Sequence, residues 1–280
     1  MTHPVDNVLS GIREAGRQAA RRILPKRARD FGSRALDIIS AVRCVGVTGC
    51  RRLTAASAEG RSTAMTAFTV RSLAHPIWIR HEQSDVNELV HTVFRKTYGQ
   101  WLPETAPRWI LDLGANIGDT AAWFLSRFPT ARVVAVEPDP ANHEMALRNL
   151  RPYGSRAIVV NAAVWPTDGE LVFLAGDRPS GSRVRAAQAG EPTSCTAISI
   201  PTLMRRYEIP EIDVLKCDIE DAEETLFREN ADPWLSKTHH LCIEIHSPAA
   251  RAAVLNAVAR HGFTGRPYRD IHVFRKTARF

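Results

Sequence analysis

The chain has 280 residues, 44% apolar and 24% charged, a composition that suits a folded protein with a sizeable core and excludes wholesale disorder. The net charge is +7, and much of the positive excess lies before residue 70. No stretch approaches the ~20 consecutive apolar residues of a membrane-spanning helix, and no signal sequence is visible, so we expect a cytoplasmic protein. The five cysteines are scattered without a C-x-x-C pair, which predicts reduced thiols that bind no metal.

A basic extension is expected at the N-terminus. Residues 8–24 and 35–45 place apolar side chains three and four positions apart with arginines between them, as in an amphipathic helix. Such an extension either makes peripheral contact with a membrane or a partner, or forms a helical cap or loose tail, and the second interpretation is favoured. Residues 52–66 are rich in Ala, Ser, Thr and Gly, which predicts a linker. We therefore assign residues 1–62 to a basic extension that is helical or partly disordered.

Residues 63–108 are expected to form a cap on the domain that follows. Residues 68–79 alternate apolar and polar side chains, which predicts a strand or hairpin, and residues 86–98 have helical spacing. Three polar residues between these elements either close over a ligand as a lid or form a solvated turn and a helix N-cap. They are Arg80, Ser84 and Asp85.

From residue 109 to 280, short apolar strands alternate with helical stretches. Strands are expected at 109–113, 132–136, 157–160, 212–218 and 241–245, and helices at 119–128, 141–150, 222–227 and 249–261. A β-rich excursion at 170–174 and 196–200 interrupts this rhythm, and a hairpin at 263–275 closes it. The alternation predicts βαβ units, and hence an α/β domain with a parallel sheet covered on both faces.

The segment at 110–120, Ile-Leu-Asp-Leu-Gly-Ala-Asn-Ile-Gly-Asp-Thr, is typical of a buried strand, a glycine turn and a helix start. Gly114 lets the chain turn tightly, and Gly118 lets the backbone approach a ligand. The spacing matches neither the NAD fingerprint nor a P-loop. Glu137 ends the next strand about twenty residues later, where an acid accepts both hydroxyls of a nucleotide ribose. Asn161, after the third strand, either flanks an adenine or caps a turn.

A second polar group is expected at the same edge of the sheet. Lys216, Asp218 and Glu220 alternate along one strand, and Glu244 and His246 alternate at the end of the next. Because open α/β sheets bind ligands beyond the carboxyl ends of their strands, we expect both sets to meet at that edge.

The ordered motifs resemble the FkbM-type methyltransferases, within the class I S-adenosylmethionine-dependent group. The likeness runs from residue 73 to residue 246. It rests on HPIWIR at 75–80, SD at 84–85, DLGANIG at 112–118, VEPD at 136–139, NAAV at 161–164, DVLKCDIE at 213–220, AE at 222–223 and EIH at 244–246. One position departs from the family pattern Ile-Glu-Gly-Ala-Glu, because Asp221 stands where the family has glycine.

The resemblance implies a Rossmann-like class I methyltransferase fold, with a mostly parallel seven-stranded sheet, helices on both faces and an antiparallel C-terminal hairpin. It implies S-adenosylmethionine as cofactor and methylation of a hydroxyl oxygen on a sugar, glycolipid or secondary metabolite. Carried over by position, the methionine part of the donor would be surrounded by four residues and its ribose held by Glu137. The four are Asp112, Gly114, Asn116 and Gly118.

Methyl transfer to an alcohol benefits from a group that orients or deprotonates the acceptor. Asp218 is the first candidate, His246 the second and Glu220 the third. An alternative is a divalent metal such as Mg²⁺, bound by these three residues and Glu244, that lowers the pKa of the acceptor. A third interpretation is a structural ion-pair network in which Lys216 neutralises the acids.

Two other functions compete with this one. The basic charge is compatible with methylation of RNA or protein, but the excess lies in the extension and no aromatic and basic stripe is visible, so we expect no nucleic-acid partner. Asp221 is compatible with a non-catalytic interaction protein of the same fold. The expected partner is a small-molecule or glycan hydroxyl, whose identity no sequence pattern defines.

Overall fold

The computed structural model describes residues 40–55, 64–268 and 271–277, except for 82, 96, 100–102, 104, 175–182 and 189. The helix expected at 8–24 therefore lies outside the described residues. The division of the chain at residues 62 and 108 stays a prediction.

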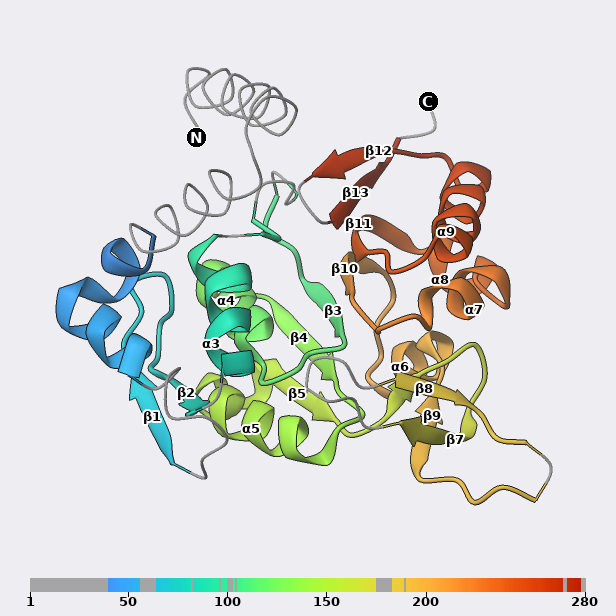
Figure 1. Cartoon of the computed structure of the whole chain (residues 1–280). Coiled ribbons are helices and arrows are strands. Elements are labelled where there is room, and N and C mark those ends of the chain that lie inside the picture. The colour runs from blue at the N-terminus through green and yellow to red at the C-terminus, as the bar shows by residue number, and fades with distance from the viewer. Residues whose placement is uncertain are drawn as a thin grey trace, which may run out of the picture.

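A seven-stranded sheet forms the centre of the fold, with its strands in the order β12-β13-β11-β10-β3-β4-β5 (Figure 1). The parallel strands are β3 (Trp109–Leu113), β4 (Arg132–Val136), β5 (Ala157–Val160), β10 (Ile212–Cys217) and β11 (Thr238–Glu244). The hairpin of β12 (Phe263–Tyr268) and β13 (Ile271–Lys276) pairs antiparallel with β11. The fold class expected from the sequence is confirmed, and β3 and β10 lie side by side where the strand order reverses.

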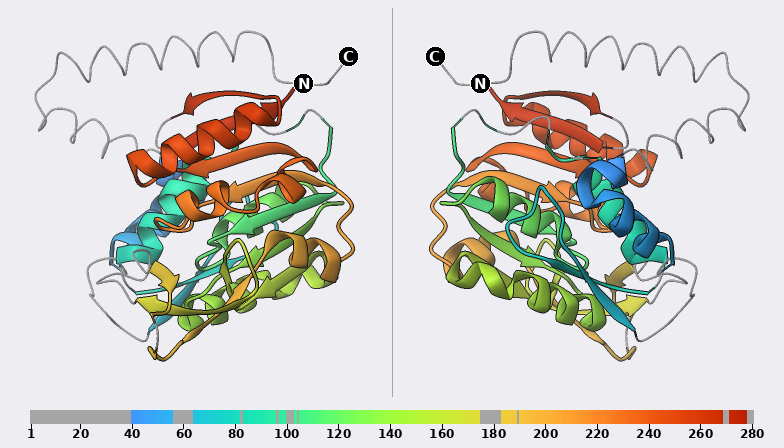
Figure 2. Two further views of the ribbon diagram at one scale, coloured as in Figure 1. Left: turned by 90° about the vertical axis from the view of Figure 1, so that its right-hand side faces the viewer. Right: turned by 90° about the vertical axis from the view of Figure 1, so that its left-hand side faces the viewer.

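Helices cover both faces of the sheet because successive residues of a strand point to opposite sides (Figure 2). On β3, Ile110 packs into the core under α4 (Asp119–Arg127) and α5 (Pro140–Leu150). Leu111 and Leu113 pack into the core on the other face. That face carries α6 (Ile200–Arg206), α7 (Glu223–Arg228), α8 (Asp232–Leu235) and α9 (Pro248–Arg260).

The cap packs on the α4 face. β1 (Met65–Phe68) and β2 (Ile77–Arg80) pair antiparallel, so the predicted hairpin is present, with its strands at the two ends of the predicted range. α3 (Gln83–Leu89) continues into a π-helical turn, η1 (Val90–Phe94), where one long helix was expected.

The linker expected at 52–66 is wrong at both ends. Residues 40–55 are helical, and Met65 begins β1. The Ala- and Ser-rich composition did not indicate two contacts with the core. Leu53 is 3% exposed, and the Arg52 guanidinium lies 5.2 Å from the Phe68 ring centre. Burial of Leu53 therefore holds the end of this helix against the core.

The β-rich excursion forms its own four-stranded sheet, in the order β6-β9-β7-β8. Its strands are β6 (Ala163–Val164), β7 (Gly169–Leu174), β8 (Arg183–Ala186) and β9 (Cys195–Ile198). The strand predicted to reach Ile200 ends two residues earlier, because Ser199 caps α6 by accepting a hydrogen bond from the Thr202 N–H. The sheet extends from the carboxyl edge of the central sheet, beside the predicted site.

All five cysteines lie among the described residues and are free thiols, as expected. No helix in the described part of the chain is both long enough and apolar enough to span a bilayer.

Candidate functional site

A cavity of about 770 Å³, including its solvent-open part, lies beyond the carboxyl ends of β3, β4 and β10. It is lined by the glycine loop, by Glu137 and Pro138 after β4, and by residues 218–220 after β10. Glu88 and Thr92 from the cap and Val184 from β8 line it as well. Five of the nine predicted site residues therefore line one space, at the point where the strand order reverses. The other four, Asp112, Gly118, Asn161 and His246, do not belong to its lining.

The glycine loop requires its two glycines for different reasons. Gly114 has a φ of +74°, and a Cβ there would lie 1.8 Å from the backbone oxygen of Asp218. Gly118 has a φ of +80° and precedes α4, where a Cβ would lie 3.2 Å from Ala146. The backbone of the loop therefore lies directly against the segment that carries Asp218, and only glycine permits that approach.

Glu137 is held by backbone N–H groups at the end of β4. Its Oε2 accepts from the N–H of Asn116 at 2.8 Å, and its Oε1 accepts from the N–H of Asp139 at 3.0 Å. Burial raises the pKa of Glu137 to about 7, although these N–H groups lower it. Each carboxylate oxygen keeps further lone pairs for a ligand.

Asn161 contacts the backbone that follows β4. Its Nδ2 donates to the backbone oxygens of Glu137 and Pro138, at 2.9 and 3.1 Å. The side chain is absent from the cavity lining. These contacts match the turn-cap alternative, and the adenine contact stays a prediction.

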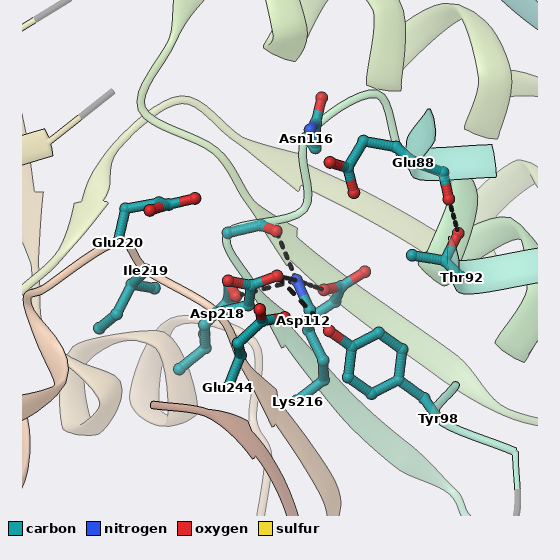
Figure 3. Close-up of polar contacts among 12 residues, drawn as sticks. Glu88, Thr92, Tyr98, Asp112, Asn116, Lys216, Asp218, Ile219, Glu220 and Glu244 are labelled. Carbon is teal, nitrogen blue, oxygen red and sulfur yellow. Dashed lines mark hydrogen bonds and ion pairs between the residues drawn. The ribbon is translucent and has the colours of Figure 1, made fainter. Parts of the chain in front are cut away.

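A buried ion pair joins β3 to β10. Lys216 Nζ lies 3.2 Å from Oδ1 of Asp112 and 3.8 Å from Oδ2 of Asp218, and it donates to the Gly114 carbonyl at 2.5 Å (Figure 3). Burial raises the pKa of Asp112 to about 6, and Lys216 opposes that rise. Burial alone lowers the pKa of Lys216, but the facing carboxylates raise it above its usual value, so the amine stays charged. The predicted neutralising role of Lys216 is therefore directed mainly at Asp112.

His246 stands among carboxylates at the ends of β10 and β11. Its Nε2 lies 3.7 Å from Asp218, 3.7 Å from Glu220 and 4.0 Å from Glu244. Its Nδ1 lies 3.0 Å from Oε1 of Glu223. Burial lowers the pKa of His246, but the hydrogen bond and charge of Glu223 and the other carboxylates raise it overall to about 9. The imidazole is therefore protonated at neutral pH.

Glu223 is a residue to which the sequence reasoning gave no role. It is fully buried on α7, and its Oε1 also accepts from the Ile219 N–H at 3.2 Å. It thus connects the loop after β10 to the imidazole of His246. The sequence did contain a signal for this role, because Glu223 lies in the first turn of the helix that follows β10.

The position that departs from the family pattern keeps a glycine-like backbone. Glu220 and Asp221 have φ values of +49° and +74°, in the left-handed region that favours glycine. The Asp221 carboxylate lies 3.0 Å from the Arg183 guanidinium, on β8. The aspartate therefore adopts the conformation that a glycine would take and adds a contact to the excursion sheet.

Two further residues at the site come from the cap: Glu88 lines the cavity, and Tyr98 contacts Asp218. The Tyr98 hydroxyl donates to Oδ2 of Asp218 at 3.4 Å. Glu88 faces the cavity from α3, and burial, followed by the charges of Asp119 and Asp218, raises its pKa to about 8. Neither residue follows a strand of the parallel sheet. The rule that ligands bind beyond the carboxyl ends of the strands, which located the other residues, therefore does not predict them.

The Arg80 and Asp85 side chains anchor the cap. Asp85 is 1% exposed and receives the Arg80 guanidinium at 2.7 and 3.0 Å, so it does not lie in a solvated turn. Arg80 also donates to Oδ1 of Asn142, a cavity residue on α5, at 2.8 Å. The lid interpretation stays a prediction.

Comparisons with known proteins give a family match for this part of the chain. Residues 112–264, more than half of the chain, match the family model described as the methyltransferase FkbM domain. A curated relative, the AMB antimetabolite synthetase AmbE of Pseudomonas aeruginosa, is 25% identical over a match covering 55% of this chain. The match spans only 9% of that much longer relative.

Solved structures with some likeness to this chain include mitomycin 7-O-methyltransferase, at 12% identity and a TM-score of 0.39, over 70% of this chain and 56% of that one. A fibrillarin of Aeropyrum pernix with natively bound S-adenosyl-L-methionine is 15% identical, with a TM-score of 0.37, over 60% of this chain and 65% of its own.

Proposed function

The chain belongs to the FkbM methyltransferase family, and from this premise we propose that it transfers a methyl group from S-adenosylmethionine to a hydroxyl oxygen of a small molecule or glycan. One observation carries the proposal. The loop that would hold the donor lies against the backbone of Asp218, the candidate base, because Gly114 has no Cβ. Donor and base thus share one cavity, as an in-line transfer requires.

The donor half of the cavity fits S-adenosylmethionine. Oδ1 of Asp112 is paired with Lys216, but Oδ2 of Asp112 and Oδ1 of Asn116 are buried and accept no hydrogen bond from the described residues. Such atoms are costly unless a ligand supplies donors. Glu137, held by two backbone N–H groups, supplies acceptors for the ribose hydroxyls. When bound, the cofactor supplies a methyl group on a positively charged sulfur that leaves as a neutral sulfide.

Asp218 is the group we assign to remove the acceptor proton. His246 is protonated at neutral pH because its pKa is raised to about 9, so it has no free lone pair with which to act as base. Its positive charge instead lies 3.7 Å from Asp218 and holds the carboxylate in place. The acceptor proton moves to an Asp218 oxygen as the oxygen–carbon bond forms and the carbon–sulfur bond breaks.

The acceptor half holds more acidic than basic side chains. Asp218, Glu220 and Glu244 surround a single imidazole, His246. An anionic acceptor such as a nucleic-acid phosphate would be repelled there, whereas a neutral hydroxyl is not. This balance supports an alcohol acceptor over RNA.

We propose a divalent cation at the same acids as a second candidate for activating the hydroxyl. Ligand atoms of Asp218, Glu220 and His246 lie within 4.8 Å of one another. The contact between Nδ1 of His246 and Glu223 leaves Nε2 free to face the two carboxylates, as is usual for metal-binding histidines. A metal there would lower the pKa of a bound hydroxyl.

The test is methyl transfer from labelled S-adenosylmethionine to a panel of sugars, glycolipids and other hydroxyl compounds. We expect the wild type to label at least one alcohol. Asp218→Asn should bind S-adenosylhomocysteine within about twofold of wild type and lose at least ~100-fold in rate, the usual scale for a general base. Asp232→Asn, an exposed aspartate on α8, is the matched control and should keep the rate.

Label transferred only to RNA, protein or a nitrogen atom would overturn the hydroxyl assignment, and an undiminished rate in Asp218→Asn would overturn the base. A parallel assay with a chelator tests whether a divalent cation is required. Loss of rate that Mg²⁺ or Mn²⁺ restores, with binding of S-adenosylhomocysteine unchanged, would support the cation, and no effect would leave Asp218 acting without it.

A further inference from the structure

Glu88 is an acid in the donor half of the cavity that belongs to the cap and not to the sheet. Its side chain points from α3 into the cavity on the side of Asn116 (Figure 3). Its carboxylate has no hydrogen-bond or ion-pair partner among the residues that the structure describes. Nothing in the packing of α3 requires an acid here.

The surroundings of Glu88 would suit a positively charged ligand group. Asp119, a buried acid at 2% exposure, lines the cavity as well. The only charged amine that lines it, among the described residues, is Lys216, which already contacts Asp112 and the Gly114 carbonyl. The Asn116 Oδ1 is buried and accepts no hydrogen bond from the described residues, so this region holds acceptors that a ligand could satisfy.

We propose that Glu88 binds the α-ammonium group of the methionine part of the donor. The inference rests on the proposed function and extends it, because it places a donor-binding residue outside the region of the family match. An ammonium group supplies three N–H donors and a positive charge to the acceptors of this region. The cap then completes the cofactor site in addition to covering it.

The charge state of Glu88 gives the contact a second consequence. Burial, followed by the charges of Asp119 and Asp218, raises its pKa to about 8, while His91 and Lys216 lower it. At pH 7 the free protein therefore holds a proton on Glu88. An ammonium group in contact with the carboxylate favours the ionised form, so binding releases this proton to the buffer.

The experiment is calorimetric titration with two ligands, one with the amino-acid group of the donor and one without it. S-adenosylhomocysteine carries the amino-acid group, and 5′-methylthioadenosine lacks it. We expect Glu88→Gln to weaken S-adenosylhomocysteine binding at pH 8 at least tenfold and methylthioadenosine binding less than twofold. Glu144→Gln, an exposed glutamate on α5, is the matched control and should change neither.

Proton release provides a readout that needs no variant. In buffers of different ionisation enthalpy at pH 7, the wild type should release protons with S-adenosylhomocysteine but not with methylthioadenosine, and Glu88→Gln should abolish the difference.

Equal affinity of Glu88→Gln and wild type for S-adenosylhomocysteine, or an equal loss for both ligands, would overturn the assignment. Failure of the wild type to bind either ligand would overturn the proposed function itself, and this inference with it.

Discussion

The two halves of the proposed site, the donor half and the acceptor half, are built differently. In the donor half, the glycine loop and Glu137 are positioned by the backbone, through positive φ angles and N–H groups. In the acceptor half, Asp218, Glu220, Glu244 and His246 are positioned by one another, through charge contacts of 3.7 to 4.0 Å. Substitutions in the glycine loop should therefore damage the fold, whereas substitutions in the acceptor half should mainly change the rate and its pH dependence.

Lys216, at the border between the halves, should show the largest effect. Lys216→Met leaves Asp112 and Asp218 without their shared cation, and breaking a buried pair costs about 3–5 kcal/mol. Chemical denaturation at pH 8 measures this loss. The cost should shrink at pH 5, because the raised pKa of Asp112, about 6, lets the acid become neutral.

The matched control is Arg228→Gln, which removes an exposed pair with Glu224. It should cost less than ~1 kcal/mol, as surface pairs do. Equal losses in the two variants would mean that the buried pair is no more important than a surface pair.

Gly114→Ala should come next, with a loss of about 3 kcal/mol or more. The new Cβ would lie 1.8 Å from a backbone oxygen, in a chain segment with a φ of +74°. Gly190→Ala is the control, because Gly190 has a φ of +80° but no atom within 4 Å of the added Cβ. It should cost only the backbone strain, about 1–2 kcal/mol. Thermal unfolding compares the two, and similar melting temperatures would contradict the close approach.

Glu223→Gln should shift the alkaline fall of the pH profile of kcat and leave donor binding unchanged. The raised pKa of His246 means that its positive charge is present below about pH 9 and lost above it, so the wild-type rate should fall there. Without the Glu223 charge, the fall should move at least about one unit lower, toward the ordinary histidine pKa. The pH profile of kcat measures the shift. A wild-type rate that rises through pH 9 would instead make His246 the base.

Asp221→Gly should have the smallest effect. Glycine relieves the left-handed strain of about 1 kcal/mol, and the exposed pair with Arg183 that is lost contributes ~0–1 kcal/mol. We expect a gain in unfolding free energy below ~1 kcal/mol and an unchanged rate. A rate increase of tenfold or more would mean that the aspartate restrains the acceptor half.

Sequence reasoning predicted the sheet and the glycine turn well, because both follow from local rules. Strand alternation gave β3, β4 and β5 at their observed bounds, and the glycine spacing identified a turn that the structure explains atom by atom. The linker error at 52–66 arose because composition does not reveal that Leu53 is buried.

The acceptor half was predicted less completely because its contacts are long-range. Glu223 reaches His246 across α7 and β11, and Tyr98 reaches Asp218 from a position 120 residues earlier. No periodicity encodes such pairs. The sequence placed the acids at one edge but could not identify the buried carboxylate that raises the pKa of the imidazole.

The central claim is that the glycine loop and Glu137 form a site for S-adenosylmethionine. Calorimetric titration of the wild type and Glu137→Ala with S-adenosylmethionine and S-adenosylhomocysteine tests it most directly. We predict micromolar binding by the wild type, at roughly −8 kcal/mol, and at least a tenfold loss in Glu137→Ala. No binding by the wild type, or equal affinity in the two proteins, would contradict the claim.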